Sequence, residues 1–159
     1  MKKTVYLAGA MSAKRNLGAT WRKNIREFLT KRKWTVYDPC VEESKYIDII
    51  SKKGHTSIRE LKIADRKGYA DLMKLIERND LKLVDKSQIV VVLVDHALFK
   101  SDGTILEIAY AVKKNKQIYA LMKMPWIKVP GWTFRRLVNN CRIFYNWDDL
   151  KAYITKEGK

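Results

Sequence analysis

One acidic side chain, Glu107, follows an apolar strand and a glycine turn, where an open α/β fold places its chemistry. Residues 89–95 form an apolar run that ends in an acid, and Gly103 then begins a pattern typical of a helix. Ligands of open parallel sheets bind beyond the carboxyl ends of the strands, and Glu107 is expected close to that edge. Its carboxylate is therefore a candidate nucleophile. The alternative is an ordinary first-turn glutamate stabilised by the helix dipole.

Further candidate residues surround the same crevice. Asp95 and Asp102 belong to the loop after the apolar run, and Asp80 precedes that run. Tyr6 lies on the first expected strand, and the loop from Gly9 onward faces the same crevice. Paired carboxylates suit glycosyl transfer, because one attacks the anomeric carbon while another handles the proton of the leaving group. Each residue also has a structural alternative: a core aromatic for the tyrosine, and a surface, turn or strand-end role for the acids.

The segments that must position these residues alternate between strand-like and helix-like patterns. This alternation is the signature of a parallel sheet with helices on both faces. Five strands with helical crossovers predict a flavodoxin-like, doubly wound α/β fold of order 2-1-3-4-5. Strands are expected at Thr4–Ala8, Thr35–Tyr37, Ile89–Val94, Gln117–Met122 and 142–145. Helices are expected at 19–31, in two pieces broken near Gly68 and reaching about Asp85, and at 103–115, 133–139 and 148–155.

Length and composition predict a single domain over residues 1–159. The 159 residues are 47% hydrophobic, which is enough for one core. No apolar run approaches about 20 residues, so no membrane span is expected. The apolar start of the chain is too short for a signal peptide, and a cytoplasmic location is expected. Cys40 and Cys141 lack metal-like spacing and the two histidines are isolated, so no metal site is expected.

The net charge of +16 is large for this length. Residues 12–35 concentrate it, with eight basic residues against Glu27 alone. Such a face attracts polyanions and speeds the capture of anionic ligands, and a solvated helix face is the alternative. No recognised nucleic-acid motif accompanies the charge, and a phosphate-bearing small molecule would also explain part of it.

Three segments resemble, in order and spacing, the signature segments of the nucleoside 2-deoxyribosyltransferases and their relatives. These segments are residues 3–9, 79–81 and 102–111. The resemblance covers most of the first 122 residues and includes the pairs Trp21-Arg22 and Asp38-Pro39. The chain from Pro125 onward resembles the family only in its strand–helix ending.

The resemblance implies a role for each of four residues. Glu107 would attack C1′ of the deoxyribose and form a covalent glycosyl-enzyme, with retention of configuration. Tyr6 would position that carboxylate, Asp80 would exchange a proton with the base, and Asp102 is nearest to the acid that binds the sugar hydroxyls. The resemblance also implies a homo-oligomer whose neighbouring subunit completes the pocket. No metal or organic cofactor is expected, because both half-reactions are substitutions at C1′.

The sequence departs from the family pattern at Ser101, which occupies the usual place of an acid six residues before the nucleophile. A serine there resembles the related deoxynucleoside-monophosphate N-glycosidases, which hold the 5′-phosphate with serines and an arginine. Ser12, Arg15 and Ser101 are therefore candidates for a phosphate pocket, because a hydroxyl binds the phosphate that a carboxylate repels. The sequence predicts deoxyribosyl transfer between bases. Hydrolysis of (deoxy)nucleoside 5′-monophosphates and a non-catalytic nucleotide- or nucleic-acid-binding module are the alternatives.

Overall fold

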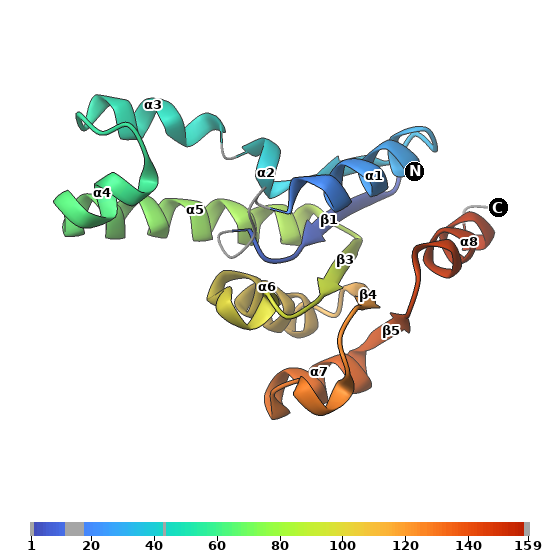
Figure 1. Cartoon of the computed structure of the whole chain (residues 1–159). Coiled ribbons are helices and arrows are strands. Elements are labelled where there is room, and N and C mark those ends of the chain that lie inside the picture. The colour runs from blue at the N-terminus through green and yellow to red at the C-terminus, as the bar shows by residue number, and fades with distance from the viewer. Residues whose placement is uncertain (1, 12–17, 43, 158–159) are drawn as a thin grey trace.

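The structure is a computed structural model that describes residues 2–11, 18–42 and 44–157. Within these residues, five parallel strands form one sheet in the order β2-β1-β3-β4-β5 (Figure 1). The predicted α/β fold and strand order are confirmed, and β5 begins one residue earlier than expected. The strands are β1 (Thr4–Ala8), β2 (Thr35–Tyr37), β3 (Ile89–Val94), β4 (Gln117–Met122) and β5 (Cys141–Phe144).

Helices connect successive strands and cover both faces of the sheet. In the described part of the chain, none of them is long and apolar enough to cross a membrane. The helices are α1 (Ala19–Thr30), α2 (Pro39–Glu42), α3 (Ser44–Lys52), α4 (Ile58–Ala64), α5 (Arg66–Lys86), α6 (Asp102–Lys113), α7 (Gly131–Asn140) and α8 (Trp147–Glu157). Two short 3₁₀ turns, η1 (Leu98–Lys100) and η2 (Trp126–Lys128), precede α6 and α7.

The region between β2 and β3 differs from its prediction. The two helices predicted there are present, and the break between them lies at Asp65, slightly before Gly68, because α4 ends and α5 begins around that residue. The Asp65 carboxylate accepts a hydrogen bond of 2.8 Å from the Gly68 backbone N–H and so caps α5. A Cβ at Gly68 would lie only 2.1 Å from that carboxylate, so the glycine permits the cap. The helices α2 and α3 were not predicted.

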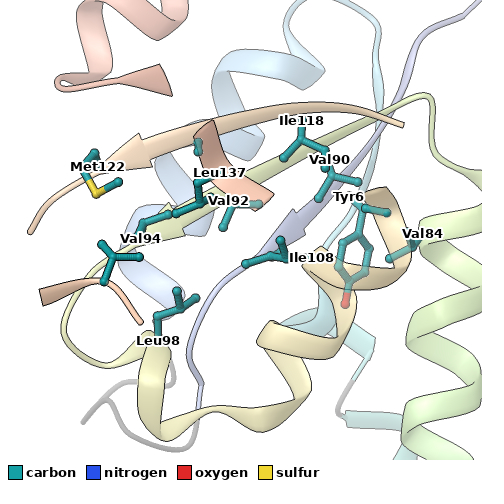
Figure 2. Packing of buried hydrophobic residues seen from close by; sticks show 14 of the residues in the cluster. Tyr6, Val84, Val90, Val92, Val94, Leu98, Ile108, Ile118, Met122 and Leu137 are labelled. Atoms are coloured by element: carbon teal, nitrogen blue, oxygen red, sulfur yellow. The ribbon is translucent and has the colours of Figure 1, made fainter. Parts of the chain in front are cut away.

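The strand β3 lies at the centre of the core and is buried on both faces, as predicted. Alternate residues such as Val90 and Val92 pack with Ile108 of α6 and Leu137 of α7 (Figure 2). The intervening residues, such as Val91, pack with side chains of α1 and α8 on the opposite face. A strand covered on both sides must be apolar throughout, which explains the continuous run in the sequence.

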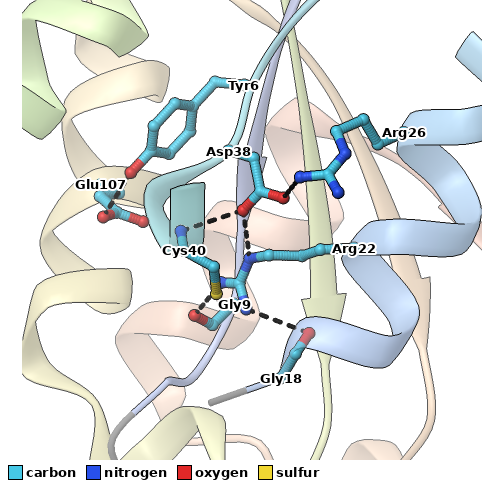
Figure 3. Close-up of polar contacts among 8 residues, drawn as sticks. All are labelled: Tyr6, Gly9, Gly18, Arg22, Arg26, Asp38, Cys40 and Glu107. Atoms are coloured by element: carbon cyan, nitrogen blue, oxygen red, sulfur yellow. Dashed lines mark hydrogen bonds and ion pairs between the residues drawn. The ribbon is translucent and has the colours of Figure 1, made fainter. Parts of the chain in front are cut away.

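A buried arginine fixes the carboxyl ends of β1 and β2. Arg22 of α1 is fully buried, and its Nη2 donates a hydrogen bond of 2.6 Å to the carbonyl of Gly9. Its Nη1 lies 3.4 Å from the carbonyl of Gly18, and its Nε lies 3.7 Å from Asp38 Oδ1 (Figure 3). Arg26 contacts the other carboxylate oxygen of Asp38 at 2.9 Å. The Arg22 guanidinium thereby connects the start of α1 with the ends of β1 and β2.

We expect Asp38→Ala to lower the free energy of unfolding by about 3–5 kcal/mol, because it leaves the Arg22 guanidinium buried without its carboxylate. Arg26→Ala is the control, since it removes a partly exposed partner of the same carboxylate and should cost about 1 kcal/mol or less. Urea unfolding followed by circular dichroism measures both. Equal small losses in the two variants would show that the buried pair contributes no more than the exposed one.

Candidate functional site

The centre of the candidate site is a hydrogen bond between Tyr6 and Glu107. The Tyr6 hydroxyl donates to Glu107 Oε1 at 2.8 Å (Figure 3). Tyr6 is fully buried in β1, where it pairs with Val90 of β3. Glu107 is only 8% exposed and lies in the second turn of α6, the helix that follows β3. Because β1 and β3 flank the switch point of the sheet, the fold brings together two residues that are 101 positions apart.

The position of Glu107 within α6 explains its burial. Thr104, Ile108 and Ala111 are the other buried residues of this helix, and together with Glu107 they form one stripe at spacings of three and four. The stripe faces the sheet, so Glu107 occupies a position where an apolar residue would be expected. A carboxyl group placed in this way needs a polar partner, and Tyr6 supplies one.

Burial and neighbouring charges perturb the ionisation of both residues. Burial raises the pKa of Glu107 to about 8, and the negative charge of Asp80 acts in the same direction. The hydrogen bond from Tyr6 and the positive charge of Arg22 oppose this rise in pKa. Burial, followed by the charge of Glu107, raises the pKa of the Tyr6 hydroxyl well above its ordinary value. At neutral pH, Glu107 therefore holds its proton, and a carboxyl group perturbed in this way marks a candidate functional site.

A cleft of about 560 Å³ opens between α5 and α6 beside Glu107. Its volume lies within the range of small-molecule sites. The helix α6 forms one wall, while α5 and the end of α4 form the other. The described residues that line the cleft are Lys62, Tyr69, Met73, Ile76, Glu77, Asp80, Leu81, Asp102, Gly103, Leu106 and Glu107.

The structure brings five of the predicted site residues together. Asp80, Asp102, Gly103 and Glu107 all line the cleft, and Tyr6 contacts Glu107 directly. Asp80 stands on the wall formed by α5, so it faces the helix that carries the glutamate. Asp102 is exposed at the first position of α6, where its carboxylate accepts a hydrogen bond from the Gly103 N–H at 2.9 Å.

The other predicted residues have different surroundings. The described residues that line the cleft do not include Gly9, Asp95 or Ser101. The Gly9 carbonyl binds Arg22, and the Asp95 carboxylate accepts from the Ala97 N–H at 3.1 Å. The Ser101 hydroxyl lies 2.9 Å from the hydroxyl of Thr104. Ser12 and Arg15, the other two members of the predicted phosphate pocket, lie outside the described residues.

Sequence reasoning missed the wall of the cleft that α5 provides. Tyr69, Met73, Ile76 and Asp80 follow one another at spacings of four, three and four, so they share one face of the helix. That pattern was visible in the sequence and would have placed Asp80 beside an aromatic and two apolar side chains. Lys62, from α4, was also missed; its ammonium group lies 5.3 Å from the centre of the Tyr69 ring.

A second hollow, of about 490 Å³, lies between α3 and α4 and lacks comparable chemistry. Apolar and hydroxyl side chains predominate in its lining, and the described residues there include no carboxylate. No group of three or more His, Cys, Asp or Glu side chains in the described ranges is placed to hold a metal ion. The cleft beside Glu107 is therefore the stronger candidate for acid–base chemistry.

Comparison with known proteins agrees with the geometry of the cleft. A sequence model of the family described as nucleoside 2-deoxyribosyltransferase matches residues 5–126. A search of curated proteins gave no match. A solved 2-deoxyribosyltransferase from the psychrotolerant bacterium Bacillus psychrosaccharolyticus is similar, with a TM-score of 0.63 and 14% identity over 98% of this chain and 95% of that chain. A Clostridium botulinum CMP N-glycosidase is similar with a TM-score of 0.53 and 13% identity, over 96% and 99% of the two chains. At these identities the two structures show a shared fold.

We expect Glu107→Gln to stabilise the protein in a pH-dependent way. Between the ordinary pKa of 4.5 and about 8, the unfolded carboxyl has lost its proton while the folded one keeps it. The stability of the wild type therefore falls as pH rises through this window, and Gln removes that loss. The free energy of unfolding of the variant should be close to that of the wild type at pH 4 and exceed it by about 2–4 kcal/mol above pH 8. Urea unfolding at several pH values measures it, and a constant difference would contradict the raised pKa.

Proposed function

The chain belongs to the nucleoside 2-deoxyribosyltransferase family, and we propose that it transfers the 2-deoxyribosyl group of deoxynucleosides between nucleobases through Glu107. Membership supports an enzyme of the deoxyribosyltransferase or N-glycosidase type. The proposal rests on one observation above the others. Tyr6 holds the Glu107 carboxyl with a hydrogen bond of 2.8 Å beside a cleft that other carboxylates line.

The first half-reaction would break the bond between the sugar and the base. A carboxylate oxygen of Glu107 bonds to C1′ as the C1′–N bond breaks, and the bonding electrons pass to the base nitrogen. Asp80, on the opposite wall of the cleft, gives a proton to the departing base. Because Tyr6 occupies Oε1, the other oxygen of Glu107 is the one that attacks.

The second half-reaction reverses these steps with a new base. A nitrogen of the incoming base attacks C1′, the bonding electrons return to the Glu107 carboxylate, and the base gives a proton back to Asp80. Two successive inversions at C1′ retain the configuration. Asp102, exposed beside the cleft, would accept hydrogen bonds from the sugar hydroxyls. Both steps are substitutions at carbon, so the side chains suffice for them.

The raised pKa of Glu107 fits this proton exchange. Glu107 must lose its proton before it can attack, and the negative charge of Asp80 opposes that loss. When the proton resides on Asp80, this repulsion disappears and the pKa of Glu107 falls. The productive state of the pair therefore has a proton on Asp80, ready for the base, and a charged Glu107. One proton moved between two carboxyl groups prepares both reactants.

Hydrolysis of (deoxy)nucleoside 5′-monophosphates is the second candidate reaction, with water in place of the incoming base. Two observations favour it. Ser101, rather than an acid, stands immediately before the first turn of α6, so no carboxylate at that position repels a phosphate. The net charge of +16 also favours an anionic substrate.

Glu107→Ala should abolish base exchange. With a deoxynucleoside and a different free base, the wild type should form the exchanged nucleoside, and intact-protein mass spectrometry should detect a deoxyribosyl adduct. We expect the variant to lose at least about a thousandfold in kcat, together with the adduct. Glu27→Ala, which removes an exposed glutamate of α1, is the control and should retain activity. Full activity in Glu107→Ala would refute the assignment of the nucleophile.

The same assay separates the two reactions. Free base released from monophosphates without any acceptor base identifies hydrolysis, whereas release that depends on an acceptor identifies transfer. Absence of both products from every deoxynucleoside and monophosphate would refute the proposed function.

Tyr6→Phe should lower kcat by about 10- to 100-fold and change KM little, because the hydroxyl contacts the nucleophile rather than the ligand. The bond from Tyr6 lowers the pKa of Glu107, so its removal should shift the rising limb of kcat/KM to higher pH. Steady-state kinetics across pH measure both effects. Tyr153→Phe is the control, since that hydroxyl bonds to Glu157 on α8, on the other face of the sheet. A change confined to KM would show that Tyr6 acts on binding instead.

A further inference from the structure

A groove of about 410 Å³ continues from the cleft along the seam between α5 and α6. The two hollows share Glu77 and Leu81 as lining residues. On α6, Gly103 and Glu107 line the cleft, and Tyr110, three residues after Glu107, lines the groove. A ligand that fills the cleft can therefore extend directly into the groove.

Three cations form a ridge along this groove. Lys74, Arg78 and Lys82 of α5 are exposed, line the groove and follow one another at spacings of four residues. We call these three residues the α5 ridge. None of them has an ion-pair partner among the described residues. Unpaired cations in a hollow are available to an anionic ligand.

The carboxylates of the groove do not cancel this charge. Asp85 accepts a hydrogen bond of 2.8 Å from the Tyr110 hydroxyl and lies 3.6 Å from the Lys114 ammonium group. Lys116 also reaches the backbone carbonyl of Asp85, at 2.6 Å. Five cations therefore gather around the groove against two carboxylates, those of Glu77 and Asp85.

The cleft has the opposite character. Besides Tyr69, the ionisable side chains among the described residues that line it are Lys62 and four acids: Glu77, Asp80, Asp102 and Glu107. A phosphate is repelled by the acids around Glu107 and attracted by the α5 ridge. A nucleotide bound at this seam would place its sugar and base in the cleft and its phosphates in the groove.

The spacing of the α5 ridge indicates more than one phosphate. Residues four apart on a helix are separated by about 6 Å along its axis, which is close to the distance between successive phosphates in an extended single strand. A mononucleotide has one phosphate and would leave most of the ridge unused. Single-strand sites combine a basic groove along the backbone with aromatic rings, and here Tyr69 and Tyr110 supply the rings.

We propose that the substrate nucleotide is presented within a single-stranded nucleic acid, whose backbone lies along the α5 ridge while one nucleotide enters the cleft. The chemistry rests on the proposed function. C1′ of the strand bonds to Glu107 as the base leaves with the electrons of the C1′–N bond and a proton from Asp80. An incoming base or water then releases the strand from Glu107, with the sugar–phosphate backbone intact.

The test of binding uses a fluorescently labelled 15-mer oligodeoxynucleotide and anisotropy over a range of salt concentrations. The triple variant Lys74→Gln, Arg78→Gln, Lys82→Gln should bind at least about tenfold more weakly near 0.1 M salt. Its slope of log affinity against log salt should be less steep by about 2, since three phosphate contacts are lost. The matched control, Lys23→Gln, Lys31→Gln, Lys33→Gln, removes the same charge from the region of α1 and should bind within about twofold of the wild type.

Two binding results would overturn the inference. Equal losses in the two triple variants would show that only the net charge matters. A deoxynucleoside monophosphate that competes as well as the oligonucleotide, mole for mole, would show that the groove binds a single phosphate.

The test of chemistry measures bases released from the oligonucleotide by mass spectrometry. The wild type should release base and Glu107→Ala should not. If the wild type exchanges bases on free deoxynucleosides but never on the bound strand, the inference fails while the proposed function stands. If neither substrate reacts, the proposed function fails. Strand affinity through the α5 ridge is measured independently of both results.

Discussion

A single buried guanidinium organises the edge of the sheet on which the site depends. Arg22 contacts the carbonyls of Gly9 and Gly18 and lies 3.7 Å from Asp38, so the ends of two strands and the start of α1 converge on one charge. A charge inside a protein is tolerated only where its partners are fixed, and these partners are backbone groups as well as a carboxylate. The same charge lowers the pKa of Glu107, at the carboxyl edge of the neighbouring strands. The arrangement of this edge and the ionisation of Glu107 are therefore coupled through Arg22, which sequence reasoning noted only as part of a motif.

The site itself is a balance between opposing effects on one carboxyl group. Burial and Asp80 favour the protonated form of Glu107, while Tyr6 and Arg22 favour the charged form. Without the two opposing groups, the pKa of Glu107 would be higher still, and its charged form would be rarer near neutral pH. Without burial, it would be solvated and less reactive. A carboxyl group with a pKa of about 8 can gain or lose its proton when a ligand changes the charge nearby. This tuning destabilises the fold, which is a common property of catalytic positions.

The sequence predicted the sheet better than the region between β2 and β3, for physical reasons. A strand buried on both faces, such as β3, must be apolar, and helical crossovers make its neighbours parallel, so the pattern predicts a doubly wound sheet, of which 2-1-3-4-5 is a common order. The helices α2 and α3 are short, and Tyr46 and Ile50 of α3 pack with Leu61 and Leu72 in a separate small cluster. Short helices of this kind are stabilised only by tertiary contacts, and the local sequence pattern does not show those contacts. The resemblance pointed to Glu107, Tyr6 and Asp80, which the structure places at the cleft, whereas the cleft wall around Tyr69 and Met73 depends on how α5 is rotated against α6.

The rotation of α5 against α6 also determines where the positive charge of α5 acts. In the sequence the density of cations is greatest at residues 12–35, because the basic residues there are close neighbours. On α5 the cations are separated by apolar and acidic residues, so the sequence shows no cluster. The turn of the helix places these residues on different faces. Asp80 and Met73 lie on the face of the cleft, while Arg78 and Lys82 lie on the adjacent face. Shifting the sequence of α5 by two residues would rotate each face by about 200° and place cations beside Glu107, where they would lower its pKa. In the proposed mode of binding, the separation of an acidic cleft from a basic groove along one helix would orient a nucleotide with its sugar toward Glu107, before any specific contact with the base forms.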